Sequence, residues 1–145
     1  MTDETIGGLT ANGERPIVAI VGGTPAGATV ATILIEQFGC EPRRVATGEA
    51  ALSLLRQDEH IDLVVLDLSV PDMDGIVALQ LIRALGPRGS LPVLALTNDR
   101  AEVATPRARA AGFAGAVVKP YSPRELFAAM EAALDCRPLR AVVHH

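Results

Sequence analysis

The chain has 145 residues, of which 49% are hydrophobic and 21% are charged, and its formal net charge is −4. This length favours a single domain around one hydrophobic core. An acidic balance without a basic stripe argues against nucleic-acid binding, and no run approaches the roughly 20 apolar residues that a membrane-spanning helix needs.

We expect one domain between two tails. A flexible tail is predicted over residues 1–15, because this stretch is polar and Gly-rich and has neither the basic start nor the apolar centre of a signal peptide. The domain is placed at residues 16–135 and a second tail at residues 136–145. Cys40 and Cys136 lack the spacing of a metal site, so we expect reduced thiols and a cytoplasmic protein.

Five short runs have the composition of strands. Four of them are continuously apolar, as in strands that are covered on both faces, and the remaining one is weak. In chain order the runs are Ile17–Val21, the weak run Arg44–Ala46, Leu63–Leu66, Val93–Leu96 and Ala116–Val118.

Helical patterns separate these runs. Two helices are predicted to stop at a glycine, the first at Gly39 and a later one at Gly86. Their apolar faces consist of Val30, Ile33, Leu34 and Phe38 in the first and of Ile76, Leu79, Ile82 and Leu85 in the second. Strands and helices that alternate with short links predict a parallel sheet with right-handed crossovers and helices on both sides.

Several helix starts carry capping residues. The last helix is predicted to begin after Ser122, which is followed by Pro123 and by Glu125 at the capping-box position. Asp74 is predicted to be the N-cap of the third helix. In the fourth helix, Pro106 predicts either a late start or a kink, because proline inside a helix removes a hydrogen bond.

The residues at the ends of the strands are the candidate functional residues, since ligands bind at the carboxyl ends of strands in such sheets. Gly22 and Gly23 follow the first strand. Asp67 follows the third, Thr97 the fourth and Lys119 the fifth, so a carboxylate, a hydroxyl and an ammonium are expected to converge. An Asp–Lys pair alone would indicate only an ordinary salt bridge.

Three segments together resemble the receiver domain of two-component response regulators. They are DLVVLDLSVPDMDG at residues 62–75, LALTND ending at Asp99 and VVKPYS ending at Ser122, and the resemblance spans about residues 16–134. It implies an α/β fold of the flavodoxin-like (βα)5 type. The sheet would be a single, doubly wound, five-stranded parallel sheet in the strand order 2-1-3-4-5.

The resemblance also implies roles for individual residues. Asp67 matches the phosphoacceptor aspartate, Thr97 the switch hydroxyl that contacts the phosphoryl group, and Lys119 the lysine that pairs with it. Tyr121 matches the aromatic rotamer switch, and the backbone carbonyl of Ser69 matches a metal ligand. These roles suit the chemistry, because a carboxylate can attack a phosphoryl donor and the added charge of about −1.5 to −2 needs a cation and a donor nearby.

The sequence departs from the family at the end of the first strand. Gly22 and Gly23 align with the acidic pair that holds Mg²⁺ in the family. Asp67 and the Ser69 carbonyl would remain as a vestigial metal site. Because Mg²⁺ favours anionic oxygen ligands, we expect weak Mg²⁺ binding, impaired phosphorylation and no other cofactor. We also expect Asp67 and Lys119 to pair with each other.

The glycine-rich stretch VGGTPAG at residues 21–27 allows other interpretations. It lacks the lysine of a phosphate-binding P-loop, and the dinucleotide fingerprint fails because no acidic residue ends the next strand. Thr24 and Pro25 instead predict a capped helix start. A weak anion or nucleotide site at this helix N-terminus, facing Lys119, stays open as a minor alternative.

The sequence therefore predicts a bacterial receiver module in phosphorelay signalling, and not an enzyme beyond self-catalysed phosphoryl transfer to Asp67. Two versions stay open: an atypical receiver whose output passes through protein contacts, and a fully functional phosphoacceptor. The expected partner is a sensor histidine kinase, a phosphotransfer protein or another signalling protein, with a homodimer as a further option. Nucleic acid and membranes are not expected partners. The chain is expected to be a single-domain regulator or a piece of a hybrid kinase.

Overall fold

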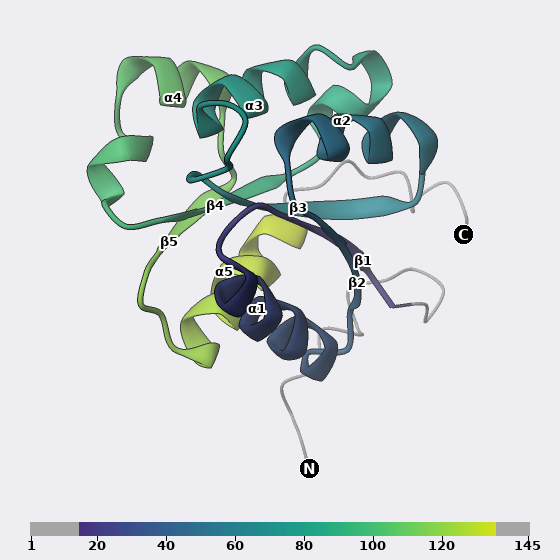
Figure 1. The fold of residues 1–145 in the computed structure, drawn as a ribbon, viewed down its shortest axis with the longest axis vertical. Helices are drawn as coiled ribbons and strands as arrows, with labels where there is room; N and C mark the ends of the chain where they lie inside the picture. Colours follow the sequence, from purple (N-terminus) through teal and green to yellow (C-terminus); the bar gives the residue numbers. More distant parts are fainter. Residues whose placement is uncertain (1–14, 136–145) are drawn as a thin grey trace.

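A computed structural model describes residues 15–135 of the chain. Five strands and five α-helices alternate in this part, and the strands form one parallel sheet in the order β2-β1-β3-β4-β5 (Figure 1). The predicted α/β fold and strand order are confirmed. The tail residues 1–14 and 136–145, with Cys136, lie outside the described residues.

Four of the five predicted strands are found in place. The strands are β1 (Ile17–Val21), β2 (Glu41–Val45), β3 (Ile61–Asp67), β4 (Val93–Thr97) and β5 (Gly115–Val118). The prediction at Arg44–Ala46 is wrong in its bounds, since β2 begins three residues earlier and ends before Ala46. This strand lies at the edge of the sheet and its residues are half-buried or exposed, so no apolar run marks it.

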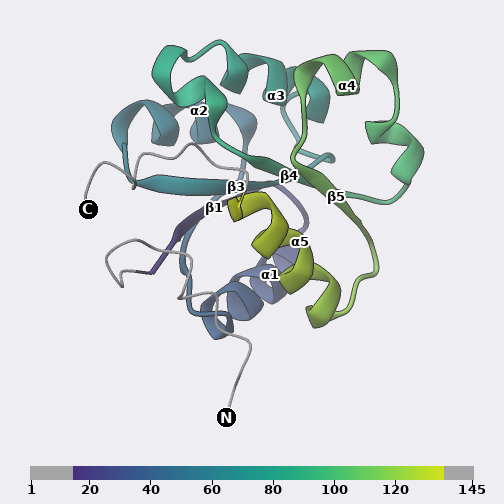
Figure 2. The ribbon, with the colours of Figure 1, turned by 180° about the vertical axis from the view of Figure 1, so that it is seen from behind.

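Helices cover both faces of the sheet. They are α1 (Pro25–Gln37), α2 (Gly48–Gln57), α3 (Gly75–Arg83), α4 (Pro106–Ala111) and α5 (Pro123–Asp135), with short 3-10 helices η2 (Gly86–Ser90) and η3 (Arg100–Val103) on either side of β4. Helices α1 and α5 lie on one face, and α2, α3 and α4 lie on the other, as Figures 1 and 2 show from opposite sides. Within residues 15–135, no helix is long and apolar enough to cross a membrane.

The predicted capping residues are confirmed. The Ser122 N–H donates to Glu125 Oε1 at 2.7 Å, and the Glu125 N–H donates to Ser122 Oγ at 3.1 Å, which completes a capping box. Asp74 accepts from the backbone N–H two residues further along at 2.7 Å. Pro106 is the first residue of α4 and follows the N-cap Thr105, so it starts the helix and does not kink it.

The hydrophobic core lies in two clusters, one on each face of the sheet. The cluster under α1 and α5 includes Ile35, Phe38, Leu63, Leu94, Leu126 and Met130. The cluster under α2 and α3 includes Leu52, Leu55, Ile61, Val64, Leu79 and Ile82. The continuously apolar strands supply side chains to both clusters, which is why they show no alternation with polar residues.

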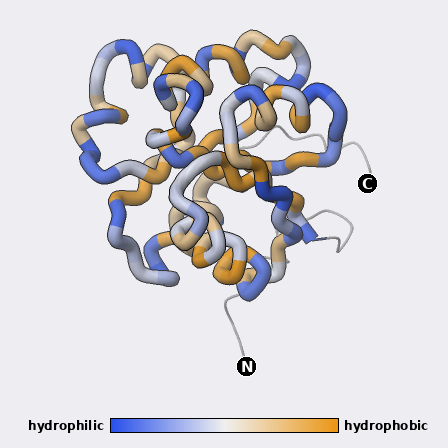
Figure 3. The backbone as a smooth tube through the Cα atoms, viewed as in Figure 1, coloured by the Kyte–Doolittle hydropathy of each residue, from blue (hydrophilic) through white to orange (hydrophobic). Residues whose placement is uncertain are grey.

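The buried face of helix α1 matches the predicted one only in part. Ala31 and Ile35 are buried, whereas the side chains of Val30 and Ile33 have exposed fractions of 51% and 48%. Phe38, at the helix end, is buried as expected, and Leu34 is partly buried and packs against the core. Apolar residues surround most of the helix, and Figure 3 shows hydrophobic colour along it, so spacing alone could not select the face that meets the sheet.

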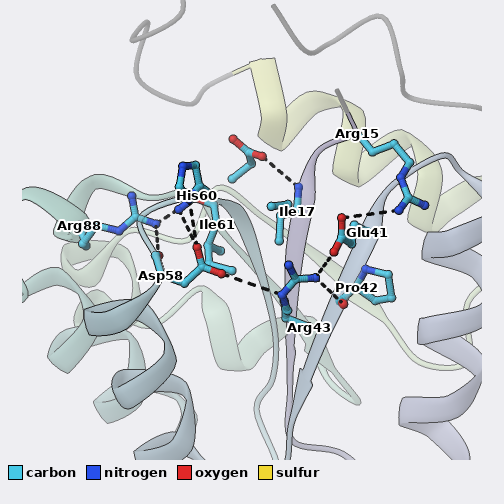
Figure 4. A network of polar contacts seen from close by, with 10 residues as sticks. Arg15, Ile17, Glu41, Pro42, Arg43, Asp58, His60, Ile61 and Arg88 are labelled. Carbon is cyan, nitrogen blue, oxygen red and sulfur yellow. Dashed lines mark hydrogen bonds and ion pairs between the residues drawn. The ribbon is translucent and has the colours of Figure 1, made fainter. Parts of the chain in front are cut away.

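A network of polar contacts joins the amino ends of the strands (Figure 4). The Ile17 N–H at the start of β1 donates to Asp62 Oδ2 in β3 at 2.9 Å. Arg43 in β2 pairs with Glu41 and lies 3.9 Å from Asp58 Oδ2. These contacts stabilise the edge of the sheet opposite the carboxyl ends, where the candidate functional residues lie.

Candidate functional site

The candidate site lies where the carboxyl ends of the central strands meet. Asp67 is the last residue of β3, Thr97 is the last residue of β4, and Lys119 directly follows β5. All three side chains line one pocket, together with Ser69 and Glu102. The strand order of the sheet therefore brings together three residues that lie up to 52 positions apart in the sequence.

The Asp67 side chain accepts three hydrogen bonds in the pocket. Its Oδ2 accepts from Lys119 Nζ at 2.8 Å, and its Oδ1 accepts from the Ser69 N–H at 2.9 Å and from the Ser69 hydroxyl. The Asp67 side chain is 9% exposed and that of Lys119 is 29% exposed, so water screens this pair only in part. The pairing expected from the sequence is present, and the Ser69 side chain is an additional partner that the sequence did not predict.

These contacts determine the ionisation of Asp67. Burial alone would raise the pKa of the Asp67 carboxyl. The hydrogen bonds from Lys119 and Ser69 act in the opposite direction and together outweigh burial, so the pKa of Asp67 lies below its ordinary value. Asp67 is therefore an anion at neutral pH, with both of its oxygens engaged.

Thr97 lies in the same pocket but bonds in another direction. The residue is 1% exposed, its Oγ1 accepts from the Asp99 N–H at 3.0 Å, and its hydroxyl contacts the Glu102 carboxylate. Glu102 belongs to η3, which follows the strand end. Sequence reasoning missed Glu102, because a glutamate in a short polar helix carries no local signal that its side chain turns back to the strand.

Tyr121 follows the strand end by three residues and is not among the residues that line the pocket. It is half-buried and packs against the cluster under α1 and α5. Burial raises the pKa of the Tyr121 hydroxyl, and the negative charge of Asp67 raises it further. The ring is thus neutral at physiological pH and lies close enough to Asp67 to be affected by its charge.

The corner after β1 is shaped by its two glycines. Gly22 and Gly23 have φ angles of +79° and +87°, in the left-handed region that favours glycine. Thr24 then caps α1, and its Oγ1 accepts from the Gly27 N–H at 3.0 Å. A β-carbon on Gly23 would lie 3.1 Å from Asp67 Oδ2, so this glycine brings the backbone directly against the carboxylate.

The residues of this pocket do not fit a magnesium ion. Gly22 and Gly23 offer no carboxylate, and the Asp67 oxygens are held by Lys119 and Ser69. Across residues 15–135, no group of three or more His, Cys, Asp or Glu side chains could hold a metal ion. A hard divalent cation that favours anionic oxygen would find the Asp67 carboxylate, which Lys119 and Ser69 already hold, and the Glu102 carboxylate, which contacts Thr97.

The two acidic residues of the β3–α3 loop serve neighbouring helices. Asp72 accepts from the Gly48 N–H at 2.8 Å and the Glu49 N–H at 3.1 Å, which fastens the loop to the start of α2. Asp74 caps α3 and forms an ion pair with Arg107 of α4 at 3.2 Å. Neither residue lines the pocket around Asp67.

Comparison with known proteins shows which family the chain is similar to. A family described as the response regulator receiver domain matches residues 18–131. The chain is 31% identical over 120 residues to the DNA-binding response regulator MtrA of Mycolicibacterium smegmatis, covering 83% of this chain and 51% of that protein. It is 34% identical over 114 residues to the sensor protein GacS of Pseudomonas syringae pv. syringae, covering 77% of this chain and 12% of that protein.

A solved structure shows the same fold. It is the receiver domain of a sensor histidine kinase from Pseudomonas aeruginosa PAO1, with a magnesium ion coordinated in its active site cleft. That domain is similar to this chain with a TM-score of 0.75 at 23% identity, over 83% of this chain and 98% of that one. The chain spans about half the length of MtrA and 12% of the length of GacS. With its fold, strand order and most of its length matched, the chain belongs to the response regulator receiver domain family of two-component signalling.

Proposed function

We propose that this receiver domain is an atypical one, in which Mg²⁺-dependent phosphorylation at Asp67 is weak and output passes through contacts with other proteins. The family itself is a signalling module and not a classical enzyme. The observation that carries the proposal is the corner after β1, where Gly22 and Gly23 take the place of carboxylates.

The missing carboxylates have a large electrostatic effect. Two unit charges about 4 Å apart interact with roughly 4 kcal/mol at an effective dielectric constant of 20, and a magnesium ion carries two charges. Hydration of the ion offsets much of this attraction. A net loss of even about 3 kcal/mol weakens binding by roughly a hundredfold.

The bonding of Asp67 supports the same conclusion. For phosphorylation, a carboxylate oxygen of Asp67 must attack the phosphorus atom of a donor, forming a new O–P bond while the bond from phosphorus to the leaving oxygen breaks. The hydrogen bonds from Lys119 and Ser69 draw electron density from both oxygens and so make either of them a weaker nucleophile. Lys119 can then stabilise the transferred group by its charge, but no second fixed cation faces it among the residues that line the pocket.

The partners follow from the family. Receiver domains interact with histidine kinases or with phosphotransfer proteins, and sensor kinases are among the relatives of this chain. We extend this to a cytoplasmic location for this domain, and to a sensor histidine kinase, a phosphotransfer protein or another signalling protein as its partner, or to a second copy of the chain. In this role the Asp67–Lys119 ion pair, in which the two charges satisfy each other, keeps the domain in one stable state until a partner binds.

A direct test is phosphorylation by a small acyl phosphate. The protein is incubated with acetyl phosphate, with and without Mg²⁺, and its intact mass is measured over time. We expect a substoichiometric phosphoryl adduct whose yield changes little with Mg²⁺. A stoichiometric, Mg²⁺-dependent adduct would show a fully functional phosphoacceptor and overturn the proposal.

Two controls make the result specific. Asp67→Asn keeps the shape of the side chain but removes the nucleophilic carboxylate, so any adduct at Asp67 must disappear in this variant. A thermal-shift screen with inorganic phosphate and nucleotides tests the anion-binding alternative, because a ligand of the native state raises the unfolding temperature. A shift with these compounds in the Asp67→Asn variant as well would favour that alternative.

A further inference from the structure

The Thr97 hydroxyl is engaged by its own strand and loop. The Asp99 N–H donates to Thr97 Oγ1 at 3.0 Å, and the Glu102 N–H donates to the Asp99 carbonyl at 3.0 Å. The Thr97 hydroxyl in turn contacts the Glu102 carboxylate. These three contacts, which we call the Thr97 ring, close the segment from the end of β4 to η3, because each residue bonds to the other two.

The hydroxyl proton of Thr97 is directed to Glu102 and not to Asp67. A threonine hydroxyl has a single proton, and a charged carboxylate accepts it more strongly than the Asp99 carbonyl oxygen, which lies 3.0 Å away. Thr97 is 1% exposed, so water does not compete for this proton. A phosphoryl oxygen on Asp67 could therefore bond to Thr97 only if Glu102 moved away.

Glu102 also changes the charge of the pocket. Asp67 and Lys119, which line the pocket with it, form an ion pair with each other at 2.8 Å. Glu102 adds a second carboxylate to the same wall. A phosphoryl group carries a charge of about −1.5 to −2 at neutral pH, so Glu102 repels it in addition to competing for Thr97.

We propose that Glu102 is a positioning residue that acts through Thr97: its carboxylate holds the switch hydroxyl in the Thr97 ring and competes for it with a phosphoryl group on Asp67. This inference rests on the proposed function, since it assigns the regulation of the same site. The resting domain is then restrained twice, with Lys119 and Ser69 holding the acceptor and Glu102 holding the hydroxyl that would respond to it.

Hydrogen exchange of single amides tests whether Glu102 holds the ring. In Glu102→Ala, we expect the backbone amides at positions 99 and 102 to exchange with solvent at least about fivefold faster than in the wild type. Glu131→Ala is the matched control, because Glu131 is exposed on α5, away from the pocket. Adding Glu102→Ala to Thr97→Val should change the exchange little further, because Thr97→Val has already removed the contact between the two side chains.

Phosphorylation by acetyl phosphate tests the competition. Glu102→Ala should increase the yield of the phosphoryl adduct at Asp67 about fivefold or more over the wild type, with Glu131→Ala unchanged. Glu102→Gln removes the charge but keeps an acceptor oxygen for Thr97, so its yield should lie between those of the wild type and Glu102→Ala. A purely structural role for Glu102 would not produce this order.

The outcomes separate the two proposals. Unchanged exchange of the Asp99 amide in Glu102→Ala overturns the role of Glu102 in the ring, and an adduct yield no higher than that of the wild type overturns the competition. Neither result affects the proposed weakness of Mg²⁺-dependent phosphorylation. A stoichiometric, Mg²⁺-dependent adduct in the wild type overturns that proposed function, while the ratio between the variants still decides on Glu102.

Discussion

A β-carbon placed on Gly22 would lie 2.6 Å from Cγ1 of Val70, closer than two unbonded carbon atoms can approach. Val70 belongs to the loop after β3, the strand that ends at Asp67. The corner after β1 therefore packs directly against this loop. The glycine is thus required twice, by its φ angle of +79° and by the space that Val70 fills. Glycine at position 22 therefore accounts both for the missing carboxylate and for the close contact with the loop after β3.

This packing predicts an order of stability among glycine variants. Gly22→Ala should lower the free energy of unfolding by roughly 2–5 kcal/mol, which combines the left-handed backbone with the overpacking against Val70. Gly23→Ala should cost less, roughly 1–2 kcal/mol, because its nearest neighbour is the end of the Asp67 side chain, 3.1 Å away. Urea unfolding followed by circular dichroism measures both values.

A third glycine supplies the matched control. Gly86 has a φ of +73°, but a β-carbon there would meet nothing within 4 Å. Gly86→Ala therefore reports the backbone cost alone. If Gly22→Ala were no more destabilising than Gly86→Ala, the contact with Val70 would have no role in the shape of the corner.

The Asp67–Lys119 pair predicts a strong effect when one partner is removed. Lys119→Met leaves the buried Asp67 carboxylate without its cation, so the variant should lose roughly 2–3 kcal/mol of stability at pH 7. Adding Asp67→Asn removes the uncompensated charge and should restore most of this loss. A double-mutant cycle of urea unfolding measures the coupling, and additive effects of the two substitutions would contradict it.

The depressed pKa of Asp67 predicts how stability depends on pH. The folded-state pKa lies below the ordinary value, so the stabilisation is fully present above the ordinary pKa and is lost as pH falls through the folded one. The stability of the wild type relative to Asp67→Asn should therefore fall between about pH 5 and pH 2. The other carboxylates are common to both proteins and cancel in the difference, and a difference that stays constant over this range would contradict the prediction.

Local signals explain how much of the fold could be predicted. The buried strands are continuous apolar runs, and the starts of α3, α4 and α5 carry caps such as Asp74 and Ser122, so their positions could be predicted from adjacent residues. The edge strand β2 has no such run. The buried face of α1 was predicted only in part, because Val30 and Ile33 are as apolar as the residues that meet the sheet.

The site could be predicted only in part for a similar reason. Strand order places Asp67, Thr97 and Lys119 at one edge of the sheet, and that order follows from the alternating pattern and the family resemblance. The bonds of Thr97 to Glu102 depend on how η3 turns back after β4, which no residue pattern encodes. The glycines indicated missing carboxylates, but the left-handed corner they build became visible only in three dimensions.

Arg83 has a structural role that the sequence did not indicate. Its guanidinium donates to four carbonyl oxygens, at 2.8 Å to Gly89, 2.7 Å to Leu91, 3.0 Å to Ala111 and 2.6 Å to Gly112. It thereby joins the ends of α3, η2 and α4. Arg83→Met should lose roughly 3 kcal/mol in urea unfolding, because hydrogen bonds to a charged group are strong and the carbonyls are left without a donor.

Two further variants separate geometry from charge at this position. Arg83→Lys keeps the charge but cannot reach four acceptors at once, so it should recover only a minor part of the lost stability. Arg124→Met, at an exposed position of α5, is the control for removing an arginine and should change stability by less than about 0.5 kcal/mol. Full recovery in Arg83→Lys would indicate that the charge alone matters.

The thiol of Cys40 can serve as a chemical probe for the opening of the core. The residue is a buried free thiol, and burial, assisted by the negative charge of Asp62, raises its pKa to about 12. Only the thiolate reacts with disulfide reagents, so in a Cys136→Ser background Cys40 should react with an aromatic disulfide at pH 8 about a thousandfold more slowly in the native protein than in urea. The rate should increase with urea in parallel with unfolding, because reaction requires that the cluster under α1 and α5 opens. Prompt labelling of the native protein would contradict the burial of Cys40 and the packing of α1 against β2 that produces it.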